Sequence, residues 1–255
     1  MRSDFTGHPP SRRILKHYFP EIGAGGFTSL DGTIEFYTRI NALIRSEDIV
    51  LDFGAGRGAA LSESRSDYKR ALMRLSGKVA KVVGVDIDKA VIDNPGLDEV
   101  AVVRANEPLP FADASFDMIV SDFVFEHVTD PKSVAAELRR ILKPGGWICA
   151  RTPNKYCLVS LATRLIRNSS HKGLLRRVQP ERKSIDIFPT AFRLNSIRDV
   201  RTHFPQMFFE DYTYRYEAEP SYFFNSRLVF VVMLLINRLS PPLLRSNLFV
   251  FLRKI

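Results

Sequence analysis

Residues 50–58 read VLDFGAGRG, an apolar run with one aspartate followed by glycine at every second position. The apolar run predicts a short buried strand, Ile49–Phe53, and the glycines predict a sharp turn into a helix. Glycine accepts left-handed backbone and lets a ligand approach the main chain closely. We therefore expect this turn to hold a nucleoside-containing ligand against backbone N–H groups at a helix N-terminus.

The stretch that follows alternates β-branched runs with helical segments, which is typical of a parallel sheet with crossover helices. Further strands are expected at Val82–Ile87, Glu99–Val103, Phe116–Ser121 and Trp147–Arg151. The clearest helix begins after Asp130 with a proline at its first position and ends before Pro144-Gly145-Gly146. This alternation of strands and helices predicts a Rossmann-like, doubly wound α/β sheet with helices on both faces.

The regions on either side of this core lack the alternation, and we expect one domain in three parts. Residues 1–47 form an N-terminal helical cap, 48–154 the cofactor-binding core, and 155–255 substrate-side helices and final strands. The cap contains the helical pattern Thr33–Ile44. The last predicted strand, Asn247–Lys254, would pair antiparallel with Met207–Tyr216, so that the sheet is mostly parallel with an antiparallel last strand.

Two aspartates narrow the choice of cofactor. Asp86 ends the second predicted strand, where a carboxylate can accept hydrogen bonds from both hydroxyls of a ribose, as NAD, FAD and S-adenosylmethionine all require. The dinucleotide fingerprint GxGxxG is absent, because Ala59 to Leu61 follow Gly58. Asp52, inside the first strand, favours a cationic amino-acid tail over a diphosphate. These residues predict S-adenosyl-L-methionine.

Residues 48–154 resemble a class I S-adenosylmethionine-dependent methyltransferase of the large small-molecule group. The resemblance covers about two fifths of the chain and rests on four blocks in the family's order. These are IVLDFGAGRG (49–58), VVGVDIDKAV (82–91), LPFADASFDMIVSDFVFEHVTDP (109–131) and ELRRILKPGGWICARTPN (137–154).

The resemblance implies a set of cofactor-binding residues. Around the methionine part it puts Asp52, Gly54, Ala55, Gly56 and Gly58. It gives the ribose to Asp86 and the adenine face to Ile87. The family usually has an aspartate before the LPF run, where this chain has Ala105, so we expect Asn106 to replace it. Glu107 and Ser121 complete the expected set.

The strand-4 exit, Ser121 to His127, is where catalytic groups are expected, because ligands gather at the carboxyl ends of such strands. His127 is the candidate general base, since imidazole titrates near neutral pH. The alternative is that Glu126 and His127 only cap or pack the helix after the strand. The pair offers two metal ligands with no third at helical spacing, so we expect no metal.

The acceptor is less explicit. The strand-4 exit reads SDFV rather than the Asn/Asp-Pro-Pro-aromatic motif of base-amino methyltransferases, and neither Cys149 nor Cys157 follows a proline as in cytosine-C5 enzymes. Both observations argue against nucleic acid. A basic stretch at 164–183 and nine apolar residues at 228–236 would suit a small-molecule or lipid-linked acceptor and peripheral membrane contact through 164–183 and 221–238. An extra helix packed over the sheet remains the alternative.

The composition bounds the remaining choices. The net charge is +9, from 37 Lys+Arg against 28 Asp+Glu, and the two cysteines cannot build a disulfide framework. With no apolar signal-peptide segment at the N-terminus, we expect a cytoplasmic protein, with the inner membrane surface as a further location. The leading hypothesis is methyl transfer to oxygen. The alternatives are a non-catalytic methyltransferase-like binding module and an RNA methyltransferase; the oligomeric state is left open.

Overall fold

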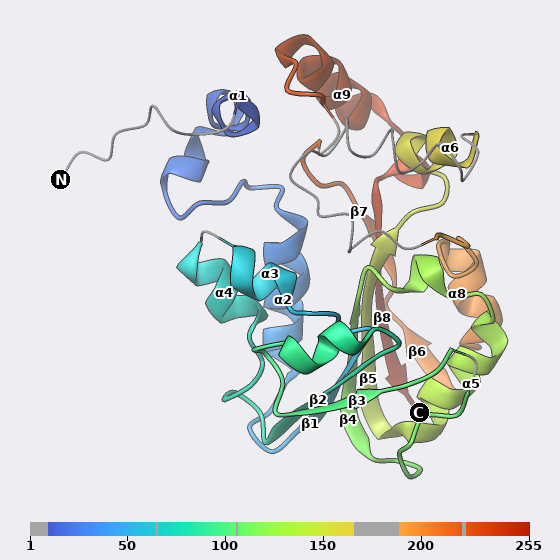
Figure 1. The fold of residues 1–255 in the computed structure, drawn as a ribbon. Coiled ribbons are helices and arrows are strands. Elements are labelled where there is room, and N and C mark those ends of the chain that lie inside the picture. The colour runs from blue at the N-terminus through green and yellow to red at the C-terminus, as the bar shows by residue number, and fades with distance from the viewer. Residues whose placement is uncertain (1–9, 65, 106, 166–188, 221–222) are drawn as a thin grey trace.

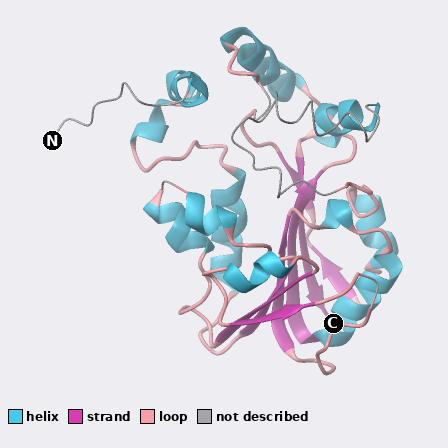
Figure 2. Cartoon of the chain, viewed as in Figure 1, coloured by secondary structure: helices cyan, strands magenta, loops and turns pink. Residues whose placement is uncertain are grey.

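The computed structural model describes residues 10–64, 66–105, 107–165, 189–220 and 223–255. Its centre is an eight-stranded sheet with the strand order β3-β2-β1-β4-β5-β8-β6, in which β7 also pairs with β8 (Figures 1 and 2). The strands are β1 (Ile49–Phe53), β2 (Lys81–Asp86), β3 (Glu99–Val102), β4 (Phe116–Asp122), β5 (Leu142–Pro153), β6 (Phe209–Asp211), β7 (Tyr214–Tyr216) and β8 (Asn247–Lys254). The predicted α/β sheet is confirmed.

The sheet changes direction at β8, which pairs antiparallel with β5, β6 and β7, whereas β3, β2, β1, β4 and β5 run parallel. The predicted pairing of residues 247–254 with 207–216 is therefore confirmed. β5 begins at Leu142, five residues before its predicted start, because the Pro-Gly-Gly segment is part of the strand rather than a loop before it. Gly145 has a positive φ of 75°, and the pairing with β4 shifts register between Phe116 and Met118.

Helices cover both faces of the sheet. The helices of the described residues are α1 (Pro10–Tyr18), α2 (Gly32–Leu43), α3 (Ala59–Glu63), α4 (Asp67–Met73), α5 (Pro131–Ile141), α6 (Leu158–Leu165), α8 (Ile197–His203) and α9 (Arg227–Leu239), with 3₁₀ turns η2 (Pro20–Gly23), η3 (Lys89–Asp93), η4 (Phe125–His127) and η6 (Pro242–Leu244). α5 begins as predicted, with the Asp130 carboxylate accepting a hydrogen bond from Ser133 N at 3.2 Å.

Side-chain alternation along the strands divides the core into two layers. Leu51 and Ile119 point toward the face that packs on Leu138 of α5. Their neighbours Val50 and Val120 point toward the other face, which packs on Phe36 of α2. The sheet is thus buried on both sides in its parallel half, as doubly wound sheets are.

The helices outside the core gather at one end. α1, α6 and α9 lie beyond the carboxyl ends of the parallel strands (Figure 1). This is the end at which open α/β sheets bind ligands, and the extra helices therefore stand over it.

Candidate active site

The glycine turn between β1 and α3 has left-handed backbone at each glycine. Gly54, Gly56 and Gly58 have φ values of 78°, 52° and 69°. The turn is tied to the neighbouring strand β2, because the N–H groups of Gly54 and Ala55 both donate to the carbonyl of Val85, at 2.8 and 3.1 Å. A side chain at Gly56 would meet no atom within 4 Å, so the turn leaves open space there.

Asp86 and Asn94 hold this turn in place. One Asp86 carboxylate oxygen accepts from Gly56 N at 2.8 Å, and the other accepts from Asp88 N at 2.8 Å. The Asn94 amide donates to the carbonyls of Ala55 and Gly56, at 3.0 and 3.1 Å. Asn94 was not predicted as a site residue. Its signal, the turn-forming Asn-Pro-Gly run at 94–96, marks a loop but does not say which segment the loop contacts.

Three carboxylates act on one another at the ends of β1, β2 and β4. Burial raises the pKa of Asp52 to about 7, and the negative charges of Asp122 and Asp86 contribute to the increase. No donor among the described residues forms a hydrogen bond with the Asp52 carboxylate. The site is therefore electronegative and suited to a cation.

Asp122 is a residue that the sequence analysis did not single out, and it is paired inside the protein. Arg151 of β5 donates to both of its oxygens, at 2.7 and 2.6 Å, and donates on to Thr33 of α2 at 3.0 Å. Tyr37 of α2 donates to the same carboxylate at 3.4 Å. Burial and the nearby charge of Asp122 raise the pKa of Tyr37 well above its ordinary value. This network ties α2 to the end of the sheet.

Three further residues at this end of the sheet, two of them predicted as site residues, have distinct environments. Ser121 is fully buried, and its hydroxyl has no hydrogen-bond partner among the described residues. Ile87 leaves 57% of its surface exposed just after β2. Phe123, after β4, has a left-handed φ of 57°, which is uncommon for a bulky residue and typical of functional sites.

The segment before Leu109 contributes less. Asn106 lies outside the described residues. Glu107 is exposed, and its carboxylate is 3.5 Å from the guanidinium of Arg104. The adenine contacts expected of Asn106 and Glu107 stay predictions.

His127 sits in η4 with its ring fixed by the backbone. Its Nδ1 is 2.7 Å from the carbonyl oxygen of Pro189, so Nδ1 carries the proton and the basic lone pair is on Nε2. Nε2 is 4.0 Å from the Glu126 carboxylate. Glu126 itself is buried and accepts from Thr152 Oγ1 at 2.8 Å. The geometry is compatible with a base and with a packing role, which leaves both alternatives for His127 open.

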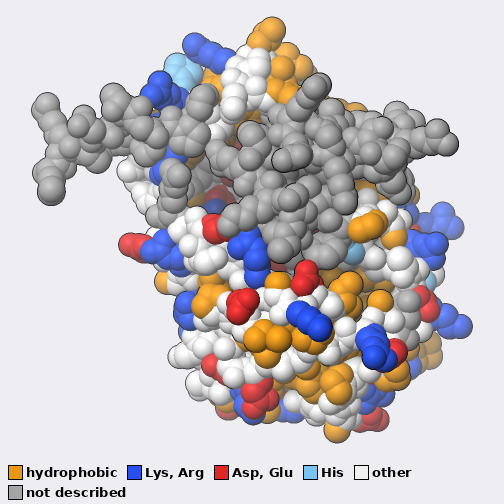
Figure 3. All heavy atoms as spheres, in the orientation of Figure 1, with side chains coloured by type: hydrophobic (Ala, Val, Ile, Leu, Met, Phe, Trp, Pro, Cys, Tyr) orange, Lys and Arg blue, Asp and Glu red, His pale blue; other side chains and the backbone are white. Residues whose placement is uncertain are grey.

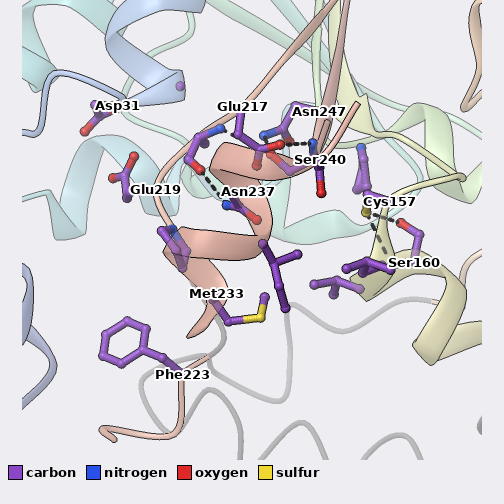
Figure 4. Close-up of a pocket in the computed structure, with 18 of the residues that line it drawn as sticks. Asp31, Cys157, Ser160, Glu217, Glu219, Phe223, Met233, Asn237, Ser240 and Asn247 are labelled. Atoms are coloured by element: carbon purple, nitrogen blue, oxygen red, sulfur yellow. Dashed lines mark hydrogen bonds between the residues drawn. The ribbon is translucent and has the colours of Figure 1, made fainter. Parts of the chain in front are cut away.

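A cavity of about 760 Å³ opens beside the strand-4 exit (Figure 4). Phe123, Glu126 and Arg151 reach it from the sheet, while His127 is not among the described side chains that line it. Much of its wall comes from outside the core, namely Asp31 and Thr33 before and in α2, Cys157 and Ser160 near α6, Glu217 and Glu219 after β7, and Met233, Ile236 and Asn237 of α9. Figure 4 shows Asp31 and Glu219 close to each other on one side of it.

The acidic part of the cavity wall is poorly solvated. Burial raises the pKa of Glu219, and the charge of Asp31 adds to the increase. Burial also raises the pKa of Glu217, whose Oε1 has no partner among the described residues. Lys69 lies 2.7 Å from Asp31 and partly balances the charge. Within the described part of the chain no three His, Cys, Asp or Glu side chains form a group that could hold a metal ion.

Residues 51–150 match the family model described as a methyltransferase domain. The chain is 34% identical over 112 residues to the ubiquinone/menaquinone biosynthesis C-methyltransferase UbiE of Hahella chejuensis, a match covering 40% of this chain and 42% of that protein. It is 32% identical over 96 residues to the demethylmenaquinone methyltransferase of Bacillus velezensis, covering 34% and 41%. The chain thus spans about two fifths of the length of the curated relatives it matches.

Solved structures share the fold at low sequence identity. An S-adenosylmethionine-dependent methyltransferase from Archaeoglobus fulgidus superposes with a TM-score of 0.55 at 17% identity, over 96% of this chain and 99% of that one. One from Mesorhizobium loti gives 0.51 at 14% identity, over 88% and 100%. Residues 51–150 therefore match a methyltransferase domain, and the chain has the class I methyltransferase fold.

Proposed function

We propose that this chain is an S-adenosylmethionine-dependent methyltransferase that transfers the methyl group to an oxygen of a small-molecule, sugar or lipid-linked acceptor. The observation that carries the proposal is the Asp52 carboxylate beside the glycine turn. A half-buried carboxylate, with a raised pKa and no donor among the described residues, is costly to ionise unless a cation meets it. The amino-acid end of S-adenosylmethionine is such a cation.

Other features of the same site fit this cofactor. The open space at Gly56 leaves the backbone accessible to a ligand. Ser121, whose buried hydroxyl lacks a partner among the described residues, lies next to Asp122 at the end of β4. The exposed Ile87 offers an apolar face for a purine. These observations support the same ligand from separate parts of the crevice.

Each residue then has a defined role in binding. Asp52 and the turn, with Gly54, Ala55, Gly56 and Gly58, hold the methionine part, and Asp86 holds the ribose. Ile87, Asn106 and Glu107 hold the adenine side. When bound, S-adenosylmethionine supplies a methyl group already activated on a sulfonium, so the protein has to align an acceptor and exclude water.

The acceptor would occupy the 760 Å³ cavity, because that cavity reaches the strand-4 exit through Phe123 and Glu126. In this proposal residues 48–154 hold the cofactor, 155–255 build most of the acceptor side, and 1–47 close the site as a cap. A hydroxyl acceptor loses a proton as it is methylated. His127, whose Nδ1 is fixed by the Pro189 carbonyl and which follows the cavity-lining Glu126 in the chain, is the proposed base.

The relatives leave the acceptor atom open. One of them is named a C-methyltransferase of quinone biosynthesis. The family match, however, ends at residue 150, and most of the cavity wall comes from residues before 51 or after 150. This distribution of residues supports a cofactor-binding core shared with the relatives and an acceptor different from theirs.

A lipid-linked acceptor would also require contact with a membrane, at the inner surface if the protein is cytoplasmic. Of the two predicted contact stretches, 164–183 lies outside the described part of the chain from residue 166 on, whereas most of 221–238 is described as α9 and the turn before it. None of the described helices combines the length and hydropathy needed to cross a bilayer.

An activity screen with methyl-labelled S-adenosylmethionine tests the function. Aqueous and lipid extracts serve as acceptor sources, and a matched reaction with His127→Ala tests the base. We expect label in a small-molecule or lipid product carrying an O-methyl group by mass spectrometry and NMR. A C-methyl product would overturn the oxygen assignment. Label found only in RNA would favour the RNA alternative, and no cofactor binding at millimolar concentration would favour the non-catalytic module.

A further inference from the structure

α9 is an apolar helix that the fold leaves mostly uncovered. Residues 228–236 are nine consecutive apolar residues, yet within α9 only Phe230 is fully buried. Four of its side chains are strongly exposed, namely Leu228 (74%), Val232 (44%), Leu235 (53%) and Leu239 (80%). Their spacing of four, three and four residues puts them on one face of the helix. We refer to these four side chains as the α9 stripe.

The surroundings of the stripe are basic. Residues 220–246, which contain α9 and the turns on either side of it, have three basic side chains (Arg227, Arg238 and Arg245) and no acidic one. The basic helix α1, with Arg12, Arg13 and Lys16, packs beside α9. Arg227 donates to the Tyr18 hydroxyl at 2.9 Å, and the Tyr18 and Phe230 rings are 5.3 Å apart. Figure 3 shows basic side chains next to hydrophobic ones at this end of the molecule.

The two flanks of the stripe differ. At about 100° per residue, Arg227 and Arg238 fall on one flank, whereas Met233 and Ile236, which line the cavity, fall on the other. A second hollow of about 390 Å³ lies along the stripe, and Ile236 and Ser240 line both it and the cavity. The exposed apolar surface is therefore continuous with the proposed acceptor site.

The length and charge of this surface select its partner. A helix of 13 residues is about 20 Å long, shorter than the roughly 30 Å hydrocarbon core of a bilayer, so α9 can lie on a membrane but not cross it. A second copy of the chain would bring Arg227 and Arg238 against like charges across a two-fold interface. An anionic lipid surface satisfies both the stripe and its basic flank.

We propose that α9, with α1 beside it, is a membrane-docking face that lays the α9 stripe into an anionic lipid surface. Docking brings the opening of the cavity at Ile236 and Ser240 to the level of the lipid headgroups, so an amphiphilic acceptor enters with its polar group in the cavity and its chain along the stripe. The route of the acceptor rests on the proposed function; the docking itself does not.

Co-sedimentation of the full chain with vesicles tests the proposal. One set of vesicles is pure phosphatidylcholine, and the other contains about one third phosphatidylglycerol. We expect partitioning to the anionic vesicles that weakens as salt is added, because part of the attraction is electrostatic. The triple variant Leu228→Ser/Leu235→Ser/Leu239→Ser should partition at least about tenfold more weakly. These side chains are exposed, so the fold should tolerate the change.

Met207→Ser is the matched control, since Met207 is 74% exposed but lies before β6 rather than on α9. It should partition as the native chain does. Arg238→Gln should weaken binding to the anionic vesicles by several-fold. Equal partitioning of the triple variant and the native chain would overturn the proposal, as would absence of binding to either kind of vesicle.

Two further readouts separate the remaining outcomes. If the native chain is a dimer by sedimentation velocity and the triple variant is a monomer, without vesicle binding, the stripe is an interface between copies and the docking proposal is wrong. Calorimetry with S-adenosylmethionine monitors the cofactor site in every variant. Vesicle binding without cofactor binding would refute only the proposed function, whereas cofactor binding without vesicle binding would refute only the docking.

Discussion

A different physical reason requires glycine at each of the three glycine positions of the 54–58 turn. Gly58 needs its left-handed backbone, and a Cβ there would lie 2.5 Å from the Asn94 side chain that fixes the turn. Gly56 has open space around it, so packing does not require a glycine there. Its left-handed backbone and the access that it gives to a ligand favour glycine at this position. Gly54 combines a positive φ with close packing, since a Cβ would lie 2.3 Å from Val124 Cγ2.

Gly54→Ala should therefore destabilise the protein through both strain and overlap. Gly77→Ala is the matched control, because Gly77 has a similar φ of 82° but a Cβ there would meet no atom within 4 Å. We expect a loss of about 1–2 kcal/mol in the free energy of unfolding for Gly77→Ala. For Gly54→Ala the loss should be about 1–3 kcal/mol greater. Urea denaturation measures both, and equal losses would contradict the packing argument.

Asp86 has two roles in the structure, and its replacement should affect both. Asp86→Ala removes the hydrogen bond from Gly56 N and the proposed ribose contact. We expect S-adenosylmethionine affinity to fall at least about tenfold, the value of one charge-assisted hydrogen bond. Asp88→Ala is the control, because Ala90 N is the one donor to the Asp88 carboxylate among the described residues. It should cost about 1 kcal/mol of stability and leave affinity unchanged. A similar loss of affinity in both variants would point to general loosening of the turn.

Sequence reasoning predicted Asp52, Asp86 and the glycines as site residues because the signal that marks them is local, set by a strand, a turn and their spacing. Asn94, Asp122 and Arg151 were missed because their meaning is tertiary. Asn94 bonds Gly56 across 38 residues, and Arg151 bonds Thr33 across 118. Nothing within a short window of sequence indicates such partners.

Among the elements, β5, β4 and α2 are joined by a single buried cation. Arg151 connects Asp122 to Thr33 and lies 5.4 Å from the Phe36 ring centre. Arg151→Met should leave the partly buried Asp122 carboxylate without its cation and cost about 3–5 kcal/mol of unfolding free energy. The exposed pair Arg39–Glu35 provides the control, and Arg39→Met should cost less than about 1 kcal/mol.

A double-mutant cycle with Asp122→Asn separates the pair from the packing of Arg151. If the ion pair dominates, the double variant loses much less than the sum of the two single losses. Additive losses in urea denaturation would mean that Arg151 acts through its packing on Phe36 instead.

At the level of elements the sequence predicted most of the sheet, because buried strands are β-branched runs bounded by turn residues. The run from Met207 to Tyr216 was predicted as one strand but forms two, β6 and β7, which pair with β8 in the same register. Between them Thr213 N donates to the Asp211 carboxylate, which interrupts the ladder. For 228–236 the sequence indicated a buried or an interfacial helix. Hydropathy alone does not separate these two, because the difference lies in which neighbours cover the helix, and only Phe230 is covered completely.

Across the whole molecule, the raised pKa of Asp52 makes stability depend on pH. A carboxyl with a folded pKa of about 7 keeps its proton in the folded state while the unfolded chain, near 3.8, has released it. Stability therefore falls as pH rises from about 4 to about 7, by up to about 1.4 kcal/mol per unit. Asp52→Asn removes this contribution. Its stability relative to the native chain should rise across that window and level off above it; a constant difference in urea denaturation would contradict the assigned shift.

At the centre of the proposed function, the Asp52 carboxylate receives the cationic end of S-adenosylmethionine. Calorimetric titration at about pH 8, where Asp52 is mostly ionised, compares the native chain with Asp52→Asn and with Asp67→Asn, whose carboxylate is 91% exposed. We expect measurable binding by the native chain, an unchanged affinity for Asp67→Asn, and at least about a tenfold loss for Asp52→Asn. Equal affinity in Asp52→Asn, or no binding by the native chain, would contradict this role of Asp52.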